Sequence, residues 1–81
     1  MSTANYDNKT TAEMVQKFGM ILKDQTELII PIWNRILSFN NSIQVKRFLI
    51  LYETGMFDHL TADNFNGEKS PEGLNEILRL L

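Results

Sequence analysis

The stretch Leu28–Phe39, LIIPIWNRILSF, carries the strongest structural signal in the chain. Eight of its twelve residues are large and apolar. Working outward from this stretch, apolar side chains between Met14 and Ile36 recur at steps of three, four and seven residues. Such steps are typical of one face of an α-helix. The pattern therefore predicts helical structure before the stretch and through it.

Pro31 is expected to interrupt this helical region. A proline inside a helix removes one backbone hydrogen bond and costs about 3 kcal/mol, and the residue before it is biased away from helical geometry. The apolar pattern nevertheless keeps its phase across the proline. We therefore expect helices over about 11–30 and 31–39, kinked at Pro31 or restarted there. Thr10 and Glu13 have capping-box spacing, which indicates where the first helix begins.

A further helix is predicted over 43–60. Its apolar residues repeat at helical steps, and either Asn41 or Ser42 can cap its start. The run 48–52 is also compatible with a buried strand. Helix is preferred because the sequence shows no second strand-like segment, and a lone strand would leave its backbone groups unsatisfied. Gly55 either ends this helix or interrupts it.

A short final helix is predicted over 71–81, after the loop of residues 61–69. Ser70 and Pro71 suit the capping and first positions of such a helix. Residues 1–9 form a polar N-terminal lead-in. The predicted fold class is therefore all-α, a small bundle of three to four helices, with residues 10–81 as a single helical domain.

Composition sets the class of protein and its expected location. Eighty-one residues make one domain at most, and 43% hydrophobic with 22% charged residues is a globular composition. The chain has no cysteine, which excludes disulfides and thiolate metal sites. Its first residues lack the apolar core of a signal peptide, and its most apolar stretch is too short to span a bilayer. We expect a cytoplasmic protein without a membrane span.

The residues needed for an active site are missing from the sequence. His59 is the single histidine, so a zinc or haem site has almost no support. The loop around Asn66-Gly67 resembles a calcium loop, but its register places Ala62 and Gly73 where carboxylates are required. The four glycines form no phosphate-binding cluster. We expect no catalytic residue, no cofactor and no bound metal, and therefore no enzymatic activity.

Excess apolar surface points instead to a protein partner. The segments Pro31–Phe39 and Phe48–Tyr52 have wider apolar arcs than the face of about 100° that a monomer's surface helix needs. We expect a homodimer or an unidentified protein partner at this surface, with Trp33 as anchor. The chain would then act as an adaptor, inhibitor or regulator, of the kind common among viral and mobile-element products. The predicted interface residues are Ile30, Trp33, Leu37, Phe39, Ile50 and Leu51.

Two other functions stay open. Arg35, Lys46 and Arg47 form a modest basic cluster that would suit a small DNA-binding regulator. The last third of the chain is acidic, however, so nucleic acid is the weaker candidate partner. A non-catalytic subunit of an enzyme complex is the third possibility, and no motif supports it.

Overall fold

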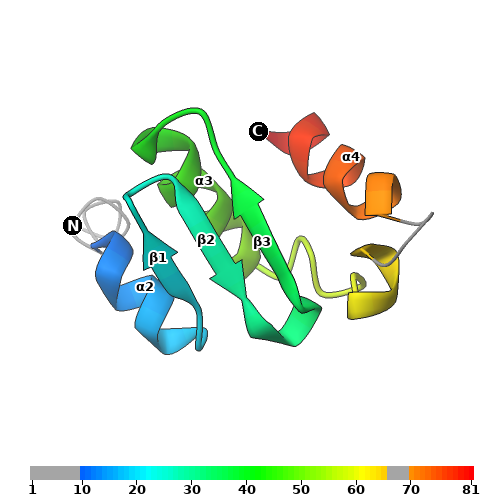
Figure 1. Cartoon of the computed structure of the whole chain (residues 1–81), viewed down its shortest axis with the longest axis horizontal. Coiled ribbons are helices and arrows are strands. Elements are labelled where there is room, and N and C mark those ends of the chain that lie inside the picture. The colour runs from blue at the N-terminus through cyan, green and yellow to red at the C-terminus, as the bar shows by residue number, and fades with distance from the viewer. Residues whose placement is uncertain (1–9, 66–69) are drawn as a thin grey trace.

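The computed structural model describes residues 10–65 and 70–81 and shows a mixed α/β fold (Figure 1). A three-stranded antiparallel sheet of order β1-β2-β3 lies within it, so the predicted all-α helical bundle is wrong. The elements, in chain order, are α2 (Thr11–Lys17), β1 (Ile21–Lys23), β2 (Glu27–Ile30), the 3-10 turn η1 (Pro31–Trp33), β3 (Arg35–Ser38), α3 (Ser42–Glu53), the 3-10 turn η2 (Ala62–Phe65) and α4 (Ser70–Leu80).

The start of α2 agrees with the capping-box prediction. The hydroxyl of Thr10 accepts a hydrogen bond from the Glu13 N–H at 3.1 Å, and the Glu13 carboxylate accepts one from the Thr10 N–H at 3.1 Å. The two bonds satisfy backbone donors that a helix start leaves without partners. The first turn of the helix is therefore fixed by two side chains.

The predicted helix over 11–30 is wrong beyond its second turn, because Gly19 redirects the chain. Gly19 has φ +70, a left-handed conformation that glycine adopts without steric penalty. The N–H of Met20 then bonds the carbonyl of Val15 at 2.9 Å, which closes the helix end. From this point the chain runs into the β1–β2 hairpin instead of continuing as a helix.

The predicted helix over 31–39 is also wrong. Pro31 does begin a helical turn, but the turn is the three-residue η1 that connects β2 to β3. Asn34 ends it in the left-handed region with φ 51, a conformation that asparagine tolerates better than most residues. Pro31 therefore starts a hairpin connection rather than a second helix.

The sheet has one covered and one open face. Leu22, Leu28 and Leu37 are in register across the three strands and point to the core. Ile21 and Ile36, which flank Ile29 in the next row, are 55% exposed. Figure 1 shows α3 behind the sheet, where it covers the leucine face. The strands thus alternate with a period of two residues, as a half-covered sheet does.

An aromatic cluster joins η1, α3 and η2. Trp33 from η1 is 2% exposed and stacks on Phe65 with ring centroids 4.7 Å apart. It also meets Phe48 and Tyr52 of α3 edge-on at 6.0 and 5.8 Å. Phe48, fully buried, stacks in turn on Phe57 at 5.3 Å. These contacts tie the hairpin connection to both α3 and η2.

The two predicted C-terminal helices are confirmed with adjusted bounds. The run 48–52 is helical within α3, which ends at Glu53 rather than near residue 60. Gly55 (φ +88) terminates it, and the Met56 N–H bonds the Leu51 carbonyl at 3.2 Å. The predicted helix over 71–81 is α4. Within it, Gly73 is so close to Phe65 that an added Cβ would lie 2.5 Å from the ring.

Candidate functional site

α3 carries apolar side chains on two opposite faces. Val45, Phe48 and Leu49 are fully buried against the sheet. Ile43 and Ile50 are seven residues apart and, at 3.6 residues per turn, fall on the other side of the helix. Ile43 is 67% exposed, whereas Ile50 is partly buried. A helix that only completed the core of one chain would need no second apolar stripe.

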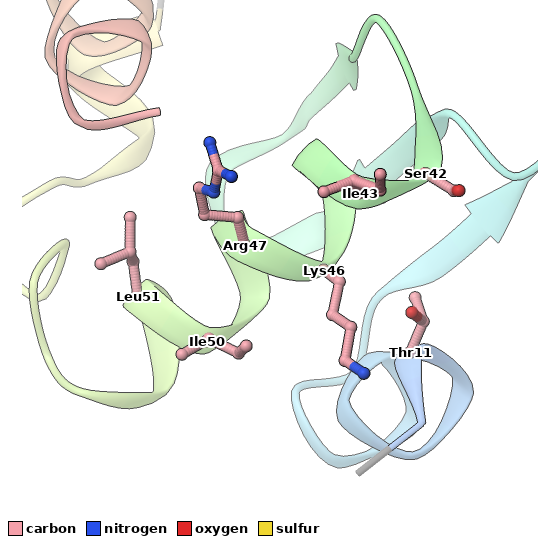
Figure 2. Close-up of a pocket in the computed structure, with 7 residues that line it drawn as sticks. All are labelled: Thr11, Ser42, Ile43, Lys46, Arg47, Ile50 and Leu51. Atoms are coloured by element: carbon pink, nitrogen blue, oxygen red, sulfur yellow. The ribbon is translucent and has the colours of Figure 1, made fainter. Parts of the chain in front are cut away.

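The second stripe lies in a surface groove of about 430 Å³, which we call the α3 groove (Figure 2). Its lining consists of six residues of α3 and one of α2: Thr11, Ser42, Ile43, Lys46, Arg47, Ile50 and Leu51. Figure 2 shows α3 as the floor, with Thr11 of α2 on one side. The groove therefore follows the exposed length of one helix and is open to solvent along it.

The charge of the α3 groove is positive. Among the described side chains, Lys46 and Arg47 are the charged residues that line it, and no carboxylate does. Figure 2 shows Lys46 extending toward Thr11, while Arg47 extends to the opposite side of the helix. The Nη1 of Arg47 donates to the Leu81 carbonyl at 3.0 Å, which holds the guanidinium beside the end of α4. The apolar stripe is thus framed by one cation on each side.

The structure separates the six predicted interface residues into three places. Ile30, Trp33 and Leu37 are 0%, 2% and 4% exposed, so a single chain already buries them. Phe39 is partly buried and lines a second groove, between β3 and α4. Ile50 and Leu51 line the α3 groove. A partner that docks on the folded chain reaches only the last three residues, and Trp33 is not among them.

The predicted basic cluster is divided as well. Lys46 and Arg47 lie in the α3 groove, whereas Arg35 lies on β3 and lines the groove next to α4. Ile43 is the member of the site that sequence reasoning missed. Its seven-residue spacing to Ile50 was the available signal, since that spacing marks a stripe on one helix face.

No other group among the described residues forms a candidate chemical site. Asp58 does not pair with His59; instead His59 Nε2 is in hydrogen-bonding contact with the Glu76 carboxylate, and the pair links α4 to the segment before η2. No cluster of three or more metal-binding side chains occurs in residues 10–65 and 70–81. In the same part of the chain, no helix combines the length and apolarity that crossing a bilayer requires.

Comparison with known proteins gives no family assignment. No protein-family model, curated protein or solved structure matches this chain. The geometry of the α3 groove is therefore the observation from which a function can be argued.

Proposed function

We propose that this chain is a protein-interaction module without an active site of its own, and that the α3 groove binds an amphipathic helix of a partner protein. The observation that carries the proposal is the second apolar stripe of α3, with Ile43 67% exposed between two cations. A module of this kind acts as an adaptor, inhibitor or regulator through what it binds.

The spacing of the stripe favours a helical partner. Side chains of one helix at steps of three, four and seven residues form ridges into which a second helix packs. Recognition by an amphipathic helix uses the same anchor spacing. Ile43 and Ile50 have this spacing, and Lys46 and Arg47 stand between them in sequence. We therefore expect two apolar anchors on the partner, one turn or two apart.

The charge of the groove favours acidic residues beside those anchors. Because the part of the lining that the structure describes contains two cations and no carboxylate, glutamate or aspartate on the partner would complement it. A second copy of this chain is a poor occupant of the same surface. A two-fold contact brings the same patch of both copies together, so Lys46 and Arg47 of one copy would lie against the same cationic patch of the other.

The free energies available from these contacts predict a weak and reversible complex. Fully burying an isoleucine side chain is worth about 1.5–3 kcal/mol, whereas an exposed ion pair contributes roughly 0–1 kcal/mol. The apolar stripe therefore supplies most of the affinity, and the cations set orientation and association rate.

Binding of designed helical peptides tests the proposal. The probe is a labelled, hydrocarbon-stapled helix with leucines at i and i+7 flanked by glutamates, and a second peptide replaces the glutamates with lysines. Fluorescence anisotropy should show binding of the acidic peptide and at least tenfold weaker binding of the basic one. The double variant Lys46→Glu, Arg47→Glu should reverse this preference.

A matched control separates the groove from general charge effects. Lys23→Glu changes an exposed cation on β1, outside the α3 groove, and should leave the preference unchanged. The proposal would be contradicted if both peptides bound equally well. It would also be contradicted if Lys23→Glu changed the preference as much as the double variant does. Tight salt-sensitive binding of a random DNA duplex, abolished by the double variant, would favour the nucleic-acid function instead.

A further inference from the structure

A second groove lies between the free edge of β3 and α4. β3 is an edge strand, since in the described part of the chain it pairs with β2 on one side only. In Figure 1, α4 runs along the other side of β3, at a distance from it. A cavity of about 330 Å³ occupies this space, and the consecutive residues 35–40 line it along the whole strand. We call it the β3 groove.

The register of the sheet identifies the backbone groups that face the β3 groove. The Phe39 N–H donates to the Thr26 carbonyl of the neighbouring strand at 2.8 Å. In an antiparallel pair the residues that bond the neighbour alternate with residues that point away from it. The backbone N–H and C=O groups of Leu37 and Phe39 therefore point to β2, whereas those of Ile36 and Ser38 point toward the groove. An edge with such groups is a template for a further strand.

The opposite wall of the β3 groove is apolar and belongs to α4. Leu74, Ile77 and Leu78 line it from that side. Leu78 is 65% exposed, although Ile77, one residue earlier, is 2% exposed. A strand placed along β3 would turn every second side chain toward these residues. The groove thus combines a hydrogen-bonding edge with an apolar wall.

Arg35 is the one charged residue among the described side chains that line the β3 groove. It stands at the start of β3, and no carboxylate among the described side chains lines the groove. At the other end lie the polar residues Asn40 and Gln44. A bound segment would complement this lining if it carried an acidic group near Arg35 and apolar side chains facing α4.

We propose that the β3 groove binds an extended peptide segment of a partner protein as a fourth strand, with an acidic group at the Arg35 end. Strand addition of this kind draws affinity from main-chain hydrogen bonds and specificity from alternate side chains. The proposal is independent of the α3 groove, which takes a helix on a different surface. It gives the module two binding sites with different ligand conformations.

The position of α4 favours a single strand over a second copy of the chain. A copy pairing through its own β3 would bring its whole sheet, and its own α4, into the space beside β3. α4 already stands on that side of the strand (Figure 1). One extended segment requires less of this space than a second sheet, which would have to displace α4.

Backbone-methylated peptides test the proposal directly. The probes are acetylated seven-residue peptides of alternating valine and threonine with aspartate at either end. Each is made unmodified and with N-methyl groups on odd or on even residues. Only one edge of the peptide pairs with β3, so one methylation pattern should abolish binding and the other should leave it within about twofold. Amide chemical shifts of the isotope-labelled full chain should change at Ile36 and Ser38.

Paired variants of the chain assign the contacts. Ser38→Pro removes one outward N–H that β2 does not use, and proline is tolerated at such edge positions. It should weaken binding at least tenfold, while Ser38→Ala should change it less than twofold. Leu78→Glu alters an exposed residue of the apolar wall and should weaken binding similarly. Arg35→Gln should abolish the preference between the two aspartate positions.

Several outcomes would overturn the assignment. Equal effects of the two methylation patterns would show that backbone pairing is not used. Amide shift changes confined to the α3 groove would exclude the β3 groove as the site. The absence of any shift change with peptide in millimolar excess would exclude it too, and neither result would affect the proposed function of the α3 groove. Changes at Ile36 and Ser38 that grow with protein concentration alone would make a second copy the occupant. If Ser38→Pro fails to fold, the methylated peptides and Leu78→Glu still decide the question.

Discussion

The sheet with α3 and the C-terminal end with α4 differ in how fully they bury their apolar residues. In the first region Leu28, Ile30 and Val45 are 0% exposed. In α4 Ile77 is 2% exposed, but Leu78 and Leu80 remain 65% and 41% exposed. α4 nevertheless has the clearer apolar periodicity in the sequence. The difference teaches that periodicity indicates which face of a helix is apolar, whereas the neighbouring elements decide how much of that face is covered.

Removing a large side chain from the well-packed region should have the largest effect. Phe48 is fully buried and meets four aromatic rings, those of Trp33, Phe39, Tyr52 and Phe57. Phe48→Ala should lower the free energy of unfolding by about 3–5 kcal/mol. A chain of this length has roughly 4–12 kcal/mol in total. Urea denaturation followed by circular dichroism measures the change.

Ile43→Ala is the control on the same helix, because Ile43 is 67% exposed. It should change the free energy of unfolding by less than about 1 kcal/mol. Similar losses for the two variants would show that the α3 groove is packed as tightly as the core, and would remove the contrast between them.

A small side chain added at Gly73 should loosen only the C-terminal end. The new Cβ would lie 2.5 Å from Phe65, whose ring is held by stacking on Trp33. Gly73→Ala should therefore destabilise the docking of α4 by about 1–3 kcal/mol, despite the gain of about 1 kcal/mol in helix propensity. Hydrogen exchange should accelerate in α4 and stay slow in β2 and α3.

Asn75→Ala provides the matched comparison, since Asn75 is exposed on the same helix. This variant should slow exchange in α4 slightly through helix propensity alone. If Gly73→Ala slowed exchange by the same amount, Gly73 would not be in tight contact with Phe65, and α4 would be less closely docked than the structure shows.

The smallest expected effect concerns the pH dependence of the α3 region. Burial, together with the nearby carboxylate of Asp58, raises the pKa of Tyr52 above its ordinary value of 10.0. The folded state therefore holds the phenolic proton more tightly than the unfolded state. This contribution to stability is fully present below pH 10 and is lost as pH rises through the folded-state pKa. Tyr52→Phe should flatten the stability profile in that alkaline range.

Spectrophotometric titration of Tyr52 gives the direct measurement. Asp58→Asn should lower the Tyr52 pKa part of the way toward its ordinary value, because only the smaller of the two causes is removed. Tyr6→Phe leaves Tyr52 as the single titrating tyrosine. A Tyr52 pKa at or below the ordinary value would contradict the burial of its ring against Trp33.

The sequence predicted the elements that are defined by local signals. The Thr10 capping box and the helical character of 48–52 both depend on neighbouring residues, whereas the predicted helix over 43–60 ran past Gly55, where α3 ends. The sheet was missed because the turn between β1 and β2 contains no glycine. Asp24 and Gln25 adopt φ 54 and 68 there, and a hairpin turn with two positive φ angles is usually marked by a glycine after Asn or Asp.

The misreading of the sheet also explains the misplaced interface. Ile29 and Ile30 point to opposite faces of β2, and only Ile30 is buried. A strand with apolar side chains on both faces, when it is interpreted as a helix, gives an apolar arc wider than the face that the surface helix of a monomer needs. The predicted anchor Trp33 is therefore a core residue. Ile50 and Leu51 do line a surface groove, because α3 is a helix and its second apolar face lies outside the core; their role in an interface stays a prediction.

The position of Trp33 gives the molecule an internal optical reporter. It is the single tryptophan of the chain, and its indole stacks on Phe65 of η2 while facing Phe48 and Tyr52 of α3. Emission from this indole depends on whether η2, against which Gly73 of α4 packs, stays in place. Partial release of η2 and α4 should shift the tryptophan emission to longer wavelength while the far-ultraviolet circular dichroism of α3 persists. Measuring both signals on one sample therefore distinguishes local opening of the C-terminal end from global unfolding.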